Sequence, residues 1–112
     1  MLRDETIARV VQFRDDRNWR QFHTPKDLAL SLSLEAAELL EVFQWSGTDL
    51  ECRNKTEKIQ EELADVLSYC ILMADVCGLD LDEIMNAKVD KNEAKYPVEK
   101  AWGSAAKYDE LT

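Results

Sequence analysis

The stretch Glu35–Trp45, EAAELLEVFQW, and its echo Glu61–Tyr69, EELADVLSY, decide the fold of this chain. Each stretch has the pattern of a helix and carries two carboxylates three residues apart. In a helix this spacing places both side chains on one face, with their Cβ atoms about 5–6 Å apart. The two pairs are Glu35 with Glu38 and Glu62 with Asp65.

Both carboxylate pairs interrupt apolar stripes. The first stripe is Leu28, Leu32, Glu35, Leu39 and Phe43, and the second is Ile59, Glu62, Val66, Tyr69 and Met73. Because apolar stripes face inward when helices pack, the carboxylates should converge in a site of low dielectric. Ionised carboxylates there would repel one another strongly unless a cation lies between them. A hard divalent metal that prefers oxygen ligands suits such a site.

Spacing alone leaves a second interpretation open. The four carboxylates could be solvated charges on helix surfaces, like Glu41 and Glu61. The interruption of the apolar stripes is the feature that favours a metal site.

The composition limits the classes of partner. The chain has 112 residues, near the common size of a single domain, and its net charge is −9. This excess of acidic groups argues against nucleic acid or an anionic membrane as a partner. An anionic substrate would need metal ions or a local basic patch to meet it.

Cysteine usage and the N-terminus predict a soluble cytoplasmic protein. Cys70 and Cys77 lie two turns apart on one predicted helix, too far to form a disulfide, and Cys52 leaves an odd number. Free thiols fit a reducing compartment. Charges near the N-terminus argue against a signal peptide, and no apolar run is long enough to span a bilayer.

The chain is predicted to be all-α. It contains three glycines and two prolines, and no stretch alternates for long between apolar and polar residues. We expect helices over residues 4–17, 25–45, 54–77 and 80–96, then a largely irregular tail, 98–112, all within one domain, 1–112. The expected helix starts are Asp4, Thr24-Pro25, Asn54 with Glu57, and Asp80 with Glu83, and Gly78 follows the end of the third helix.

Apolar residues outside the two stripes predict self-association. They are Leu30, Leu34, Ala37, Leu40, Leu67, Ile71 and Leu72. Four helices in so small a chain leave too little surface to cover all of them. We therefore expect a homo-oligomer, a dimer or a tetramer.

Five blocks of sequence carry a family resemblance. In chain order they are NWRQFHTPKDLALSL, EAAELLEVFQW, EELADVLSYCILMA, KVDKNEAKYP and GSAAKY. With these blocks the chain resembles the MazG-like all-α nucleoside triphosphate pyrophosphohydrolases, and in particular their small, single-domain dCTP pyrophosphatase branch. The implied fold is a four-helix bundle of the all-α NTP pyrophosphatase type, completed by oligomerisation. The carboxylate pairs alone are weakly specific, but the five blocks together are strongly specific.

The resemblance implies an activity. It is hydrolysis of a nucleoside triphosphate, dCTP or a close pyrimidine analogue, to the monophosphate and pyrophosphate, which would clear unwanted nucleotides from the precursor pool. The implied cofactor is Mg²⁺, with Mn²⁺ as a substitute. The metal ligands would be Glu35, Glu38, Glu62 and Asp65. We expect Glu35 or Glu38 to be the catalytic residue that orients the attacking water, because both lie on the helix that leads toward the expected base pocket.

The resemblance also implies two sets of substrate contacts. The phosphates would meet Lys88, Asn92, Lys95 and Tyr96, and the base pocket would contain Trp19, Phe22, His23 and Trp45. The family often has arginine where this chain has Lys95, a departure that loses a bidentate fork but keeps a point charge. Taken singly, the lysines also fit a solvated helix face and the tryptophans an ordinary core.

Two alternatives stay open at this point. The same chemistry could serve a broader or different preference, such as dUTP or modified triphosphates, because a base pocket depends on a few hydrogen bonds. A non-catalytic helical bundle that binds other proteins through its acidic faces would explain the charge and the extra apolar residues. It would not explain carboxylates within apolar stripes.

Overall fold

The computed structural model describes residues 2–111, and every regular element in that range is a helix, which confirms the all-α class. The chain divides after Gly78 into two compact units. The first unit contains α1 (Asp4–Asp16), a 3-10 helix (Trp19–Phe22), α2 (Pro25–Glu41), a 3-10 helix (Arg53–Lys55) and α3 (Thr56–Cys77). The second contains α4 (Leu81–Lys95), α5 (Val98–Ala101) and a 3-10 helix (Tyr108–Glu110).

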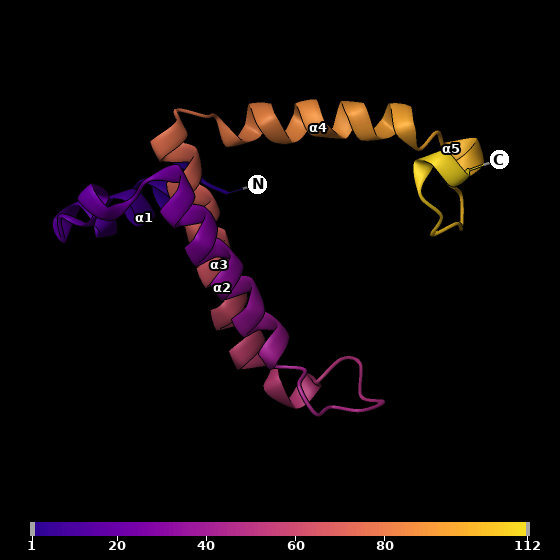
Figure 1. Ribbon diagram of the computed structural model, residues 1–112, viewed down its shortest axis with the longest axis horizontal. Coiled ribbons are helices and arrows are strands. Elements are labelled where there is room, and N and C mark those ends of the chain that lie inside the picture. Colours follow the sequence, from indigo (N-terminus) through magenta and orange to yellow (C-terminus); the bar gives the residue numbers. More distant parts are fainter. Residues whose placement is uncertain (1, 112) are drawn as a thin grey trace. The chain divides into compact units, whose positions relative to one another are not determined.

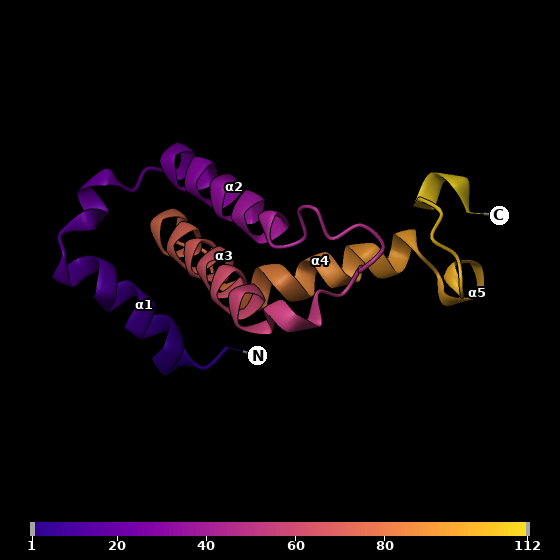
Figure 2. The same ribbon diagram turned by 90° about the horizontal axis from the view of Figure 1, so that it is seen from below.

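Helix α3 is the central helix of the first unit. Helix α2 runs antiparallel beside it, and α1 lies against another side of it (Figures 1 and 2). Buried side chains between these helices include Leu28 of α2 with Ile71 and Leu72 of α3. Every member of the two predicted stripes is buried or half-buried. The stripes therefore face the interior of the first unit, and their two glutamates are carried inward with them.

Three helix boundaries follow the sequence signals. The hydroxyl of Thr24 accepts a hydrogen bond from the backbone N–H of Asp27 at 3.1 Å, and Pro25 takes the first helical position of α2. At the start of α4, the carboxylate of Asp80 accepts from the N–H of Glu83 at 3.0 Å. Helix α3 ends at Gly78, whose φ of +66° lies in the left-handed region that favours glycine.

Helix α2 is shorter than predicted. It ends at Glu41, because the next backbone N–H groups bond three residues back instead of four: Val42 to Leu39, Phe43 to Leu40 and Gln44 to Glu41. The tightened turns lead to Trp45, which has a φ of +66°. Trp45 therefore lies in a turn and does not end the helix.

Two smaller expectations were also wrong. Asp4 is the first helical residue of α1, and the N-cap position belongs to Arg3. The predicted capping box at Asn54 and Glu57 does not form, because a 3-10 turn, Arg53–Lys55, precedes α3. The tail contains α5 and a 3-10 helix, so about half of its described residues are regular.

Some of the apolar residues outside the two stripes are buried within the first unit. Ile71 and Leu72 are buried, whereas Leu30, Leu34, Leu40 and Leu67 are exposed. The cysteines are free thiols as predicted, with Cys52 buried and Cys77 exposed. Within residues 2–111, no helix combines the length and the apolar character needed to cross a bilayer.

Candidate active site

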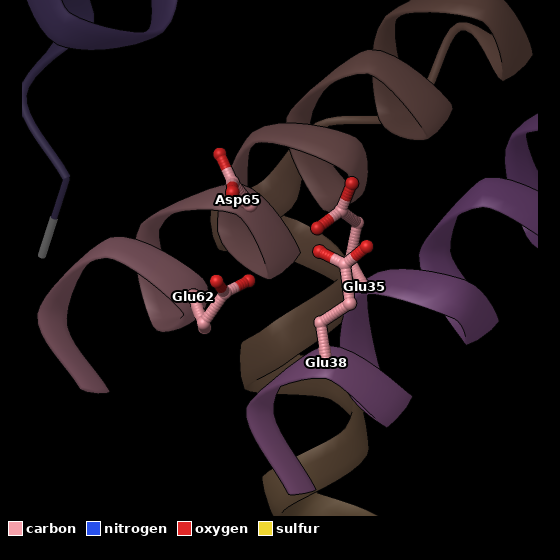
Figure 3. A group of neighbouring side chains, drawn as sticks. All are labelled: Glu35, Glu38, Glu62 and Asp65. Carbon is pink, nitrogen blue, oxygen red and sulfur yellow. The ribbon is translucent and has the colours of Figure 1, made fainter. Parts of the chain in front are cut away.

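The four carboxylates predicted to converge do so between α2 and α3. Glu35 and Glu38 extend from α2 toward Glu62 and Asp65 of α3 (Figure 3). One oxygen from each residue lies within 4.8 Å of an oxygen from every other. We call these four residues the carboxylate cluster. The i,i+3 spacing on each helix and the antiparallel packing of the helices produce it.

Burial and charge make the carboxylate cluster electrostatically unfavourable by itself. Glu62 is buried and Glu35 is half-buried, whereas Glu38 and Asp65 are exposed. Burial raises the pKa of Glu35 to about 7, assisted by its hydrogen bond to Glu38 and by the neighbouring negative charges. Glu35 is therefore partly protonated near neutral pH when no cation is bound.

Lys58 partly compensates the negative charge of the carboxylate cluster. Its ammonium Nζ lies 2.9 Å from Glu62 Oε1, one helical turn away on α3. This hydrogen bond is the main reason why the pKa of Glu62 lies below its usual value, although burial acts in the opposite direction. One lysine balances one of the four carboxylates and leaves the carboxylate cluster with excess negative charge.

The residues of the cluster fit a metal ion that prefers oxygen ligands. Glu35 Oε2 and Glu62 Oε2 are buried and have no hydrogen-bond partner among the described residues. Buried polar atoms without partners are uncommon, and a cation would satisfy both oxygens. All four ligand groups are carboxylates, the hard donors that suit Mg²⁺, Mn²⁺ or Ca²⁺. The carboxylate cluster could therefore hold a divalent metal ion.

A cavity of about 470 Å³ adjoins the carboxylate cluster between α1, the first 3-10 helix and α3. Asp65 belongs both to the cluster and to the cavity wall. The rest of the wall is Thr6, Arg9, Val10, Phe13, Arg14, Trp19, His23, Ser68, Tyr69 and Leu72. Aromatic rings with a few polar groups are typical of a pocket for a planar organic ligand.

The aromatic part of the cavity wall is organised by mutual contacts. The rings of Phe13 and Trp19 meet edge to face, with centroids 5.8 Å apart. The guanidinium of Arg17 lies 3.7 Å from the Phe13 ring centroid and donates to the Phe13 carbonyl at 2.9 Å. These contacts hold two flat surfaces at the cavity before any ligand binds.

The structure brings together two of the four residues predicted to bind a base. Trp19 and His23 both line the cavity. Burial, and then the charges of Arg14 and Arg20, lower the pKa of His23, so its imidazole is neutral near pH 7. Its Nδ1 atom is buried and has no partner among the described residues. Phe22 and Trp45 do not line this cavity, and Trp45 is 93% exposed.

The residues predicted to meet the phosphates belong to the second unit. Lys88, Asn92 and Lys95 lie on α4, and Tyr96 follows its last residue. Lys95 Nζ lies 4.9 Å from the ring centroid of Tyr108, and the rings of Tyr96 and Tyr108 meet edge to face. The phosphate contacts of these residues stay a prediction.

Sequence reasoning gave no role in the site to the other residues of the cavity wall, among them Phe13, Arg14 and Tyr69. A signal was present for two of them. Arg14 shares one face of its helix with Ile7, Val10 and Val11, and Tyr69 lies in the same stripe as Glu62. A charged residue on an apolar helix face indicates an inward-facing polar site, as the carboxylates within the apolar stripes did.

Three comparisons place this geometry among known proteins. Residues 30–111 match the model of the MazG-like family. The chain is 39% identical to dCTP pyrophosphatase 1 of Bos taurus, over 96% of this chain and 67% of that protein. It is 40% identical to dCTP pyrophosphatase 1 of Homo sapiens, over 96% of this chain and 66% of that one. The chain thus spans about two thirds of the length of these relatives.

A solved structure has the same fold. It is a pyrophosphatase from Archaeoglobus fulgidus, with a TM-score of 0.78 and 43% sequence identity. The match covers 84% of this chain and 91% of that one.

Proposed function

This chain belongs to the MazG-like family and is a nucleotide diphosphatase, and from that premise we propose that it hydrolyses dCTP to dCMP and pyrophosphate with Mg²⁺. One observation carries the proposal. The carboxylate cluster shares Asp65 with a cavity walled in part by aromatic rings, which would give a metal-bound triphosphate and its base adjacent sites. We place this activity in the cytoplasm, where it would remove unwanted nucleotides from the precursor pool.

Glu35, Glu38, Glu62 and Asp65 are the proposed metal ligands. When bound, Mg²⁺ or its substitute Mn²⁺ neutralises phosphate charge and acidifies the attacking water. Glu35 or Glu38 is the proposed catalytic residue, which would orient the attacking water molecule. Lys58 keeps Glu62 ionised, since its ammonium favours the charged form of that carboxylate.

The base is proposed to lie in the cavity. Trp19 offers a ring face for stacking, which contributes roughly 1–3 kcal/mol per base, and the neutral His23 offers a buried nitrogen for a hydrogen bond. Phe22 and Trp45 are further proposed contacts. The names of the relatives favour cytosine, and dUTP or modified pyrimidine triphosphates are the competing substrates.

The triphosphate is proposed to meet the second unit as well. Lys88, Asn92, Lys95 and Tyr96 provide two ammonium groups, an amide and a phenol along and directly after α4. In a chain of net charge −9, such groups would stabilise the charge that develops on the leaving pyrophosphate.

We also propose that the chain works as a homo-oligomer, a dimer or a tetramer. Leu30 and Leu34 of α2 and Leu67 of α3 are exposed apolar side chains on the two helices that hold the carboxylate cluster. A second copy would remove this surface from water.

A substrate panel tests the function. Purified protein is incubated with Mg²⁺ and each natural or modified triphosphate, and the products are separated by chromatography. We expect dCMP and pyrophosphate from dCTP, and no reaction in the presence of a chelator. Glu38→Gln and Asp65→Asn should abolish turnover, whereas Glu61→Gln removes an exposed carboxylate outside the cluster and should not.

Two other outcomes of the panel are informative. If Glu38→Gln and Asp65→Asn both keep full activity, the proposed site is wrong. If no triphosphate is hydrolysed, an acidic protein-binding module becomes the better account of the chain.

A further inference from the structure

Arg14 is a buried cation in the wall of the cavity. It is the only buried residue of α1, with 3% of its surface exposed, and it lines the cavity together with Trp19 and His23. A buried guanidinium must be paired, because its desolvation would otherwise destabilise the fold strongly.

Two carboxylates hold the guanidinium of Arg14 in place. Its Nη1 donates to Asp75 Oδ2 of α3 at 2.7 Å, and its Nε donates to Asp15 Oδ1 at 3.0 Å. Its Nη2 lies 2.9 Å from the same Asp15 oxygen. The contacts are made from both helices that form this part of the cavity, so the guanidinium is fixed in position before a ligand binds.

The pairing leaves part of the guanidinium free. Arginine has five N–H donors, one on Nε and two on each of Nη1 and Nη2. The three contacts use at most one donor on each nitrogen. One N–H on Nη1 and one on Nη2 therefore remain for another acceptor. Arginine cannot accept a hydrogen bond or lose its proton in the working pH range. At this position the wall offers donors only.

We propose that Arg14 is a specificity-determining residue, which selects cytosine through the adjacent acceptors N3 and O2 of its Watson–Crick edge. Uracil and thymine carry an N–H at N3, which would face a donor and lose its own hydrogen bond to water. A site built to pair with polar groups rejects analogues that leave buried groups unpaired. The inference rests on the proposed function, because it requires a pyrimidine nucleotide in the cavity.

The selectivity ratio tests this role. We compare kcat/KM for dCTP and dUTP in the wild type, Arg14→Met and Arg14→Gln. The wild type should prefer dCTP, and Arg14→Met should lower that preference roughly tenfold to hundredfold, the discrimination typical of a bidentate arginine contact. Glutamine adds an acceptor that can pair with the N3–H of uracil, so Arg14→Gln should lower the preference at least as far.

Arg20→Met is the matched control. Arg20 lies 3.6 Å from the same Asp75 oxygen but is exposed and does not line the cavity. Its removal alters the charge around Asp75 and should leave the dCTP/dUTP ratio unchanged. Arg14→Lys keeps a charge beside Asp75 without the planar fork, and it should also lose selectivity. Arg14→Lys therefore takes the place of Arg14→Met and Arg14→Gln in the assay if those uncharged variants do not fold.

A binding measurement separates base selection from catalysis. Calorimetry on the folded wild type should show tighter binding of dCMP than of dUMP, a difference that Arg14→Lys reduces. If dCTP is hydrolysed but the Arg14 variants keep the wild-type ratio, the proposed function stands and the role of Arg14 is refuted. If the wild type hydrolyses dCTP and dUTP equally, the role is also refuted. If it hydrolyses no triphosphate, both proposals fail.

Discussion

Replacing Glu35 with glutamine should stabilise the metal-free protein while removing its function. The charged form of Glu35 is disfavoured in the folded state, chiefly by burial and then by Glu38 and the rest of the carboxylate cluster. Glutamine has nearly the same shape, carries no charge and can donate a hydrogen bond to a neighbouring carboxylate. The variant therefore removes a repulsion that the folded wild type must tolerate.

The size and sign of the effect follow from the pKa. The pKa of Glu35 is about 7 in the folded protein, against an ordinary value of 4.5. The folded state thus holds this proton more tightly than the unfolded state. The resulting stability is fully present below pH 4.5 and is lost as the pH rises through 7. At pH 8 the loss is about 3 kcal/mol, and Glu35→Gln should recover most of it.

Thermal unfolding in chelator, at one protein concentration, measures this difference. At pH 8 the Tm of Glu35→Gln should exceed that of the wild type on the order of 10 °C, and at pH 4.5 the two should nearly coincide. Glu61→Gln, an exposed change on α3, should show no such gain. With Mg²⁺ the wild type should rise in Tm and the variant much less. A variant no more stable than the wild type at pH 8 would refute the reasoning.

Two further changes test the surroundings of the carboxylate cluster and the oligomer. Lys58→Met should lower the Tm of the metal-free protein at pH 7. The loss should fade as the pH falls below 4.5, because the ion pair stabilises only while Glu62 is ionised. An unchanged Tm at pH 7 would count against the pair. Leu34→Asp should shift the protein to smaller species in light scattering, whereas Leu50→Asp, in an exposed loop, should not; equal masses would contradict the proposed interface.

The carboxylate cluster was predictable because it depends on periodicity alone. An i,i+3 spacing on each helix fixes which side chains share a face, and apolar neighbours show which face is buried. The sequence alone therefore predicted that Glu35 and Glu62 lie in a common site. The cap at Thr24 and the end of α3 at Gly78 were equally local, since each depends on one residue and the backbone beside it.

The cavity was harder to predict because it depends on long-range packing. Arg14 and Asp75 are 61 residues apart, and nothing local in either helix indicates that they form an ion pair. The end of α2 was missed for another reason. Val42 and Phe43 continue the apolar pattern, but the backbone changes to three-residue hydrogen bonds at that point, which the pattern of side chains does not reveal.

Because Asp65 belongs both to the carboxylate cluster and to the cavity wall, it would couple the two proposed binding events. The free energy of binding a metal ion at the cluster would then depend on whether a base occupies the cavity. By thermodynamic reciprocity, the factor by which a metal ion changes nucleotide affinity equals the factor by which the nucleotide changes metal affinity. Where free divalent metal is scarce, a well-fitting base would draw the ion into place and a poorly fitting one would not. The identity of the base would then affect how tightly the protein binds the proposed catalytic metal ion.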